Sequence, residues 1–196
     1  MISYEQILEN NKAWVTEKLQ LDPDYFFKLS QGQSPGYLFI GCSDSRMPLN
    51  TFTKTSPGEL FIHRNIANVV SESDPNFLAV LQYAVEVLHV PHIIIAGHYD
   101  CGGVKSVFYN QAYGHIKRWL SPIFHIYKKY ARELENLSTD REKYDRLAEL
   151  NVIEGVMKLS RHPLITKARE QGQSLQIHGW IIDIYTGIIK DLRVLG

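Results

Sequence analysis

Short apolar blocks alternate along the chain with longer stretches in which apolar residues recur at helical spacing. A block that is apolar at nearly every position is typical of a strand buried on both faces of a parallel sheet. Two blocks fit this description, residues 37–41 and 92–97, and residues 60–63 and 175–184 are predicted to be strands as well. The turn residues Tyr185-Thr186-Gly187 follow the last block and predict an antiparallel pairing with a short edge strand at 188–190.

The stretches between the blocks are predicted to be helical. From Asp74 onward, Phe77, Leu81 and Val85 recur at the spacing of one helix face. Residues 116–160 are mostly helical with a break near 136–140, and a further helix ends near Gln171. A helix between two buried strands is a crossover connection, which requires the strands to be parallel. The predicted fold class is therefore α/β, with a mainly parallel central β-sheet flanked by helices, an N-terminal helical arm and an antiparallel edge strand.

The first thirty residues precede any strand signal. Ser3 is a suitable N-cap for a first helix, and Pro23 opens a second, short one. The apolar side of these helices can lie on a partner subunit or on the core of the same chain, and the sequence leaves both open. With no repeat and no linker, residues 1–196 are predicted to form a single domain, with a helical arm at 1–30 and an α/β core at 31–196.

Charge and hydropathy exclude several classes of partner. The 21 basic and 21 acidic side chains cancel, which argues against binding to nucleic acid or to an anionic membrane surface. No apolar run approaches membrane-spanning length, and the N-terminus lacks the basic start and apolar block of a signal peptide. We therefore expect a cytoplasmic protein that binds neither membrane nor nucleic acid.

Residues that can bind a metal ion follow two of the buried blocks. Cys42-Ser43-Asp44-Ser45-Arg46 comes after the first block, and His98-Tyr99-Asp100-Cys101 after the third. Ligands bind beyond the carboxyl ends of parallel strands, so both clusters are expected at one edge of the sheet. Two thiolates and one imidazole suit zinc and leave a fourth position that Asp44 can fill or give up to water. Alternatively, the cysteines are small buried hydrophobic residues without a ligand role.

The two clusters together resemble the paired signature of the β-class carbonic anhydrases. The signature consists of Cys42-Ser43-Asp44-Ser45-Arg46 and His98-x-x-Cys101-Gly102-Gly103. The similarity continues in family order and spacing through three segments: Pro57 to Asn68, Gln82 to Val85, and His178 to Trp180. It covers nearly the whole chain from about Gln33 onward, which makes residues 31–196 the expected zinc-binding core.

The resemblance implies a carbonate dehydratase, a zinc lyase that hydrates carbon dioxide reversibly to bicarbonate and a proton by attack of zinc-bound hydroxide. It implies one Zn²⁺ per chain, with Cys42, His98 and Cys101 as ligands. Asp44 resembles a residue that is a fourth ligand in closed forms of the family and pairs with Arg46 in open ones. Such an ionised carboxylate can only accept hydrogen bonds, so it would orient the attacking hydroxide.

The resemblance also implies a substrate pocket and an assembly. The positions that resemble the family's carbon dioxide pocket, partly contributed across a dimer interface, are Gln33, Phe61, Ile66, Tyr83 and Gly102. Plain core packing is the competing explanation for Phe61, Ile66 and Tyr83. The family forms homodimers that often assemble into tetramers or larger forms.

Two other functions compete with carbon dioxide hydration. The same zinc chemistry can act on carbonyl sulfide or carbon disulfide, since relatives of this fold do so. A structural zinc module is the non-enzymatic alternative, and the Asp44–Arg46 pair argues against it because a saturated site needs no such partners.

One subgroup of the family is inhibited by bicarbonate at a non-catalytic site formed by a Trp, an Arg and a Tyr. The Arg position is Arg64 in this sequence, but Phe39 stands at the Trp position, and Ile181-Ile182 follows where the Tyr is expected. Neither replacement offers the missing hydrogen-bond donor. We therefore expect no such regulatory site, and an Asp44 that stays paired with Arg46.

Overall fold

The computed structural model describes residues 2–195 and divides into two compact units, Met1–Ser34 and Pro35–Gly196. The first unit contains α1 (Tyr4–Leu21) and α2 (Tyr25–Ser30). Ser3 caps α1 as predicted, because its hydroxyl accepts a hydrogen bond from the backbone N–H of Gln6. No residue of α1 is buried, and most of its large apolar side chains are exposed in the isolated chain, among them Ile7, Leu8 and Leu19.

The second unit is built on a five-stranded sheet with the order β2-β1-β3-β4-β5. The strands are β1 (Tyr37–Cys42), β2 (Leu60–Asn65), β3 (His92–His98), β4 (Gln176–Ile182) and β5 (Ile189–Asp191). The first four are parallel, and β5 pairs antiparallel with β4. The predicted α/β fold and its antiparallel edge strand are therefore confirmed.

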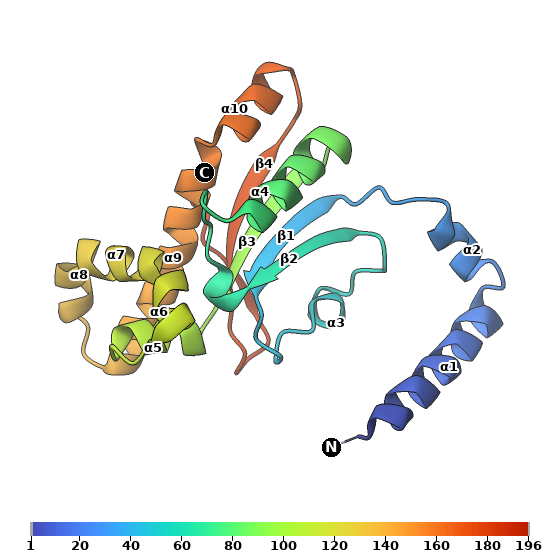
Figure 1. Ribbon diagram of the computed structural model, residues 1–196, viewed down its shortest axis with the longest axis horizontal. Helices are drawn as coiled ribbons and strands as arrows, with labels where there is room; N and C mark the ends of the chain where they lie inside the picture. Colours follow the sequence, from blue (N-terminus) through green and yellow to red (C-terminus); the bar gives the residue numbers. More distant parts are fainter. Residues whose placement is uncertain (1, 196) are drawn as a thin grey trace. The chain divides into compact units, whose positions relative to one another are not determined.

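Helices connect the strands and surround the sheet (Figure 1). Their bounds are α3 (Leu49–Thr53), α4 (Pro75–Gln82), α5 (Gly102–Phe108), α6 (Gly114–Trp119), α7 (Ser121–Lys129), α8 (Ala131–Glu135), α9 (Asp140–Ser160) and α10 (Pro163–Glu170). Two short segments, η1 (Ile66–Asn68) and η2 (Tyr83–Val87), follow β2 and α4. The break predicted near 136–140 separates α8 from α9, whereas α3 was not predicted because it has no long amphipathic pattern.

The sheet has two unequal apolar layers. Leu38, Ile40 and Ile95 belong to a large core that includes buried residues of α4, α5, α7, α9 and α10. Phe39, Ile94 and Ile182 belong to a small second core with Leu49 of α3. Alternate residues of each strand therefore point into different layers, as expected for strands buried on both faces.

Helix α9 packs closely against the strand that carries His98. A Cβ atom added to Gly97 would lie 2.8 Å from Val152 Cγ2 and 3.0 Å from Ile181 Cδ1. Only a residue without a side chain fits this contact, so Gly97 fixes the distance between β3 and α9.

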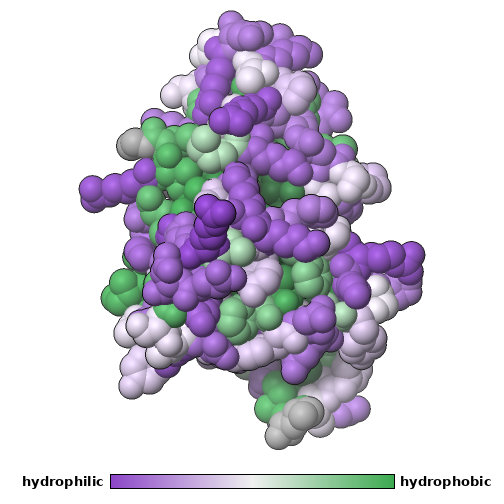
Figure 2. Space-filling model, turned by 90° about the vertical axis from the view of Figure 1, so that its left-hand side faces the viewer, coloured by the Kyte–Doolittle hydropathy of each residue, from purple (hydrophilic) through white to green (hydrophobic). Residues whose placement is uncertain are grey.

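Within residues 2–195, no helix combines the length and hydropathy that a bilayer crossing requires. Figure 2 shows hydrophilic side chains over most of one face of the molecule, with apolar areas between them. The predicted cytoplasmic location stays a prediction.

Candidate metal centre

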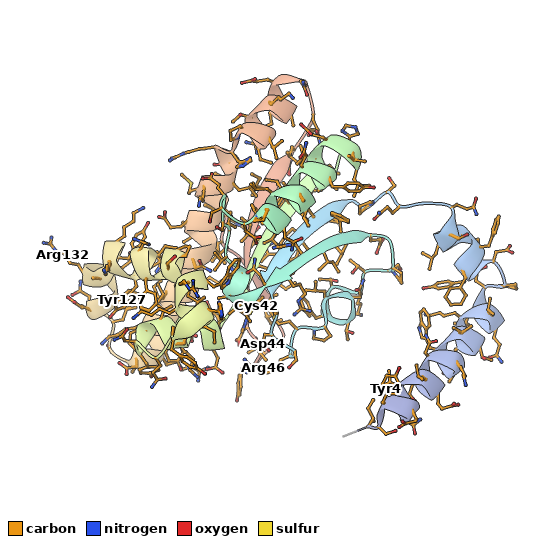
Figure 3. All side chains as sticks on the ribbon, viewed as in Figure 1. Tyr4, Cys42, Asp44, Arg46, Tyr127 and Arg132 are labelled. Carbon is orange, nitrogen blue, oxygen red and sulfur yellow. The ribbon has the colours of Figure 1, made fainter. Side chains whose placement is uncertain are left out.

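The candidate centre forms where two neighbouring parallel strands end. Strand β1 ends at Cys42 and β3 at His98, and the register Gly41↔Ala96 brings both ends to the same edge of the sheet. Cys101 follows three residues after His98 and occupies the N-cap position of α5. Figure 3 shows Cys42, Asp44 and Arg46 close together at this edge. The expected convergence of the two sequence clusters is therefore observed.

Cys42, His98 and Cys101 are all buried, and their ligand atoms lie within 4.8 Å of one another. The two Sγ atoms are 3.9 Å apart, too far for a disulfide, and both cysteines are free thiols. In a tetrahedral zinc site with Zn–S bonds of about 2.3 Å, two sulfur ligands lie about 3.8 Å apart. The observed separation therefore fits this metal without rearrangement of the backbone.

The imidazole of His98 is oriented for a ligand role. Its Nδ1 donates a hydrogen bond of 2.9 Å to the carbonyl oxygen of Tyr99, which places the proton on Nδ1. Nε2 is then the lone-pair nitrogen, and it is buried without a hydrogen-bond partner among the described residues. A buried polar atom without a partner is costly, and a metal ion on Nε2 would remove that cost.

The two thiols influence each other's ionisation. A hydrogen bond from Cys101 lowers the pKa of Cys42, with burial acting in the opposite direction and His98 adding to the lowering. The same thiol–thiol contact, together with burial, raises the pKa of Cys101. The first thiolate therefore forms readily, and thiolate is the form that binds metal ions.

Asp44 lies beside this group and is held by Arg46. Its Oδ1 accepts hydrogen bonds from the backbone N–H and the Nε of Arg46, and its Oδ2 accepts one of 2.8 Å from Nη2. These bonds hold the pKa of Asp44 well below its usual range, although partial burial opposes the shift. Oδ2 is also 3.7 Å from His98 Nε2, so an ionised oxygen borders the candidate metal position.

Arg46 also links the two site loops. Its Nη1 donates to Asp100 Oδ2 and its Nη2 to the Asp100 carbonyl oxygen, both at 3.4 Å. Asp100 has a left-handed backbone with φ of 56°, and its Oδ1 accepts a hydrogen bond from Lys105. These contacts fix the segment between His98 and Cys101 relative to the loop after β1.

Two carboxylates of α9, neither of them predicted from the sequence, support the second loop. Asp145 accepts a hydrogen bond from the backbone N–H of Asp100. Glu149, which is buried, accepts one of 2.6 Å from the Tyr99 hydroxyl and is also bonded by Arg146 and Lys190. Burial alone would raise the pKa of Glu149, but these donors outweigh it and lower the pKa. The only sequence signal was a pair of acidic residues four positions apart on one helix face.

The predicted substrate residues lie in four different places. Phe61 and Tyr83 stack on each other with ring centroids 5.7 Å apart. Ile66, which is 47% exposed, has its Cγ2 3.2 Å from the place a Cβ on Gly103 would occupy, so it lies beside the start of α5. Gly102 is exposed, with open space where a side chain would be. Gln33 is exposed in the N-terminal unit, and its role in binding substrate stays a prediction.

Comparison with known proteins identifies the family. A family model described as carbonic anhydrase matches residues 37–189. A carbonic anhydrase of Emericella nidulans is 41% identical over 192 residues, covering 98% of this chain and 84% of the relative. A carbonic anhydrase of Candida albicans is 39% identical, covering 97% of this chain and 68% of the relative.

Solved structures agree with this result. A β-carbonic anhydrase of Sordaria macrospora, described as tetrameric, matches with a TM-score of 0.92 and 40% identity, covering 97% of this chain and 96% of its own. The Coccomyxa β-carbonic anhydrase, solved in complex with acetazolamide, matches with a TM-score of 0.92 and 35% identity, covering 98% of this chain and 87% of its own.

The Glu149 network predicts a pH-dependent loss of stability. In metal-free protein, Glu149→Gln should lower the free energy of unfolding at pH 7 by about 1–3 kcal/mol, because it leaves charged donors without their carboxylate. The folded state lowers the pKa of Glu149 below its ordinary 4.5, so this stabilisation is complete above that pH and fades as the pH falls through the lowered value. Urea unfolding at pH 7 and near pH 4 measures the difference, with Glu9→Gln on exposed α1 as the control. An equal loss at both pH values would contradict the network.

Proposed function

Because this chain belongs to the β-carbonic anhydrase family of enzymes, we propose that it hydrates carbon dioxide reversibly to bicarbonate and a proton, with one zinc ion per chain. The observation that carries the proposal is the buried group of Cys42, His98 and Cys101 with an ionised Asp44 beside it. A structural zinc site would have no need of an adjacent carboxylate held by an arginine. The arrangement therefore favours a catalytic centre over a structural one.

Two thiolates and one neutral imidazole nitrogen would hold the metal in this proposal. When bound, zinc would supply a Lewis acid that lowers the pKa of water from about 15.7 to about 7, which provides a nucleophile at neutral pH. The buried positions of all three side chains keep competing water away from the ligand atoms. His98 is kept in the ligand tautomer by its hydrogen bond to Tyr99 O.

Asp44 would orient the nucleophile. Its carboxylate is ionised and can only accept hydrogen bonds, so Oδ2 would accept one from the O–H of the attacking oxygen and turn a lone pair of that oxygen toward the carbon of the substrate. Arg46 keeps Asp44 in this position through its bidentate contact. Without Arg46, the carboxylate would be free to move onto the metal.

Carbon dioxide is small and apolar, so its pocket needs mainly apolar walls and few donors. We assign Phe61, Ile66 and Tyr83 to these walls and Gly102 to the open space beside Cys101. Gln33 would donate its amide N–H to an oxygen of bicarbonate. Ile66 and Tyr83 are 47% and 44% exposed in the single chain, which supports a pocket completed by a second copy.

We propose a homodimer, or a larger assembly built from it, in which β2 faces the partner. Strand β2 is one of the two edge strands of the sheet, and an exposed edge is a template for pairing. Large apolar side chains are exposed on β2 and the two segments η1 and η2: Ile62, Ile66, Tyr83 and Val87. The helices of residues 1–30 would form an arm on the core of 31–196 of the partner, since no residue of α1 is buried in its own unit.

Cytoplasmic location is part of the proposal. Both cysteines belong to the candidate metal group, and neither is used for a disulfide. Free thiol ligands are typical of proteins in reducing compartments.

Zinc content and turnover test the function directly. Wild-type protein should contain one zinc per chain and hydrate carbon dioxide in stopped-flow assays. Cys101→Ser or Cys42→Ser should lose most of the zinc and nearly all activity, because a neutral hydroxyl replaces a thiolate ligand. Full zinc content and activity in Cys101→Ser protein would contradict the role of Cys101 as a zinc ligand. Faster turnover of carbonyl sulfide than of carbon dioxide by the same preparation would assign the alternative reaction.

Asp44 and Arg46 can be tested separately from metal binding. Asp44→Asn should retain zinc but lose about 100-fold or more in kcat, because an amide can donate a hydrogen bond where an acceptor is needed. Arg46→Ala should also impair turnover, since it releases Asp44. Asp140→Asn, at an exposed carboxylate in the first turn of α9, should leave turnover unchanged. Wild-type kinetics in Arg46→Ala protein would refute the role of the pair.

The proposed dimer interface can be tested by the mass of a β2 variant in solution. Ile62→Asp should shift the protein toward monomers in light scattering, because it places a charge in the apolar surface beside the edge of β2. Ile188→Asp, at an exposed position next to β5 at the opposite edge of the sheet, should keep at least the dimer mass. An unchanged mass for Ile62→Asp protein would place the interface elsewhere.

A further inference from the structure

The side chain of Arg64 reaches the loop that follows β1. Arg64 lies on the edge strand β2, where it pairs in register with Gly41 of β1. Its Nε donates to the carbonyl oxygen of Cys42 at 2.8 Å, its Nη1 to that of Met47 at 3.1 Å, and its Nη2 to that of Asp44 at 2.8 Å. One guanidinium therefore binds three carbonyl groups of a single six-residue loop.

This contact constrains the shape of the loop. The N–H groups of a guanidinium lie in one plane in a fixed geometry. The three carbonyl oxygens can therefore accept from it at the same time only if their positions relative to one another are kept. Lysine could not replace it, since its ammonium is a point charge on a flexible stem. Hydrogen bonds from a charged donor are also stronger than those between neutral backbone groups.

The loop that Arg64 holds carries both a candidate ligand and the candidate orienting carboxylate. Cys42 is at its first position, and Asp44 is bonded by Arg64 at its backbone and by Arg46 at its side chain. A backbone hydrogen bond within the loop shares an acceptor with Arg64. The N–H of Met47 donates to the carbonyl oxygen of Asp44, which also accepts from Arg64. The direction of the Asp44 side chain thus depends on where Arg64 fixes its backbone.

We propose that Arg64 is a positioning residue, which holds the Cys42–Met47 loop so that Asp44 presents Oδ2 to the metal group. The proposal rests on the proposed function for its effect on turnover, but not for its effect on the loop. It differs from the role that the family subgroup with a bicarbonate site gives to this arginine, because here the guanidinium binds the protein's own backbone.

Arg64→Lys tests the proposal by two independent measurements. In metal-free protein, the amides of Ser43, Arg46 and Met47 should exchange hydrogen about tenfold faster in the variant than in the wild type, as expected when a charge-assisted hydrogen bond is lost. These amides are bonded within the loop or to β2, so they report its order. This readout requires neither zinc nor activity, so a wild-type protein without carbon dioxide hydration would overturn the proposed function and leave this measurement intact.

In zinc-loaded protein, Arg64→Lys should lower kcat per bound zinc by about tenfold, with the zinc content kept at one per chain. Arg169→Lys is the matched control, because Arg169 also donates its Nε to a backbone carbonyl, that of Leu175, just before β4. It should leave both loop exchange and turnover unchanged. Arg64→Ala should exceed the effect of Arg64→Lys.

Two results would overturn the proposal. One is wild-type exchange of the loop amides in both Arg64 variants. The other is a loss of turnover that only matches a loss of zinc or of folded protein, because a merely structural role would leave the activity per bound zinc unchanged.

Discussion

The parallel pairing of β1 with β3 is the constraint on which the candidate centre depends. Because the two strands are neighbours and run in the same direction, Cys42 and His98 emerge at one edge of the sheet although 56 positions separate them in the sequence numbering. Cys101 then needs only the short turn into α5 to join them. Any shift in this register would separate the thiols from the imidazole, so the apolar residues that fix the register also fix the site.

Charged side chains from distant elements hold the two loops that this edge carries. Arg64 of β2 binds the loop after β1, and Asp145 and Glu149 of α9 bind the segment after β3. Arg46 joins the two loops through Asp100. The ligand atoms themselves stay in a buried group. The geometry of a small centre is therefore determined by contacts outside it, as is usual for metal sites.

The strands and the candidate ligands could be predicted from the sequence because both have local sequence patterns. Buried strands are apolar at nearly every position, and ligand residues such as Cys42 and His98 stand at their carboxyl ends. The roles of Glu149 and Arg64 could not be predicted, since each side chain binds a partner far away in the sequence that no local pattern identifies. Short elements such as α3 were missed because tertiary contacts of Leu49 with the sheet, rather than helical periodicity, stabilise them.

The central claim is that Cys42, His98 and Cys101 bind zinc in the folded enzyme. X-ray absorption at the zinc edge of the purified protein tests it most directly, because sulfur and nitrogen ligands differ in bond length and scattering. The account predicts two sulfur ligands at about 2.3 Å, with nitrogen or oxygen ligands at about 2.0–2.1 Å completing four-coordination. A zinc ion with no sulfur ligand, or with only one, would contradict it.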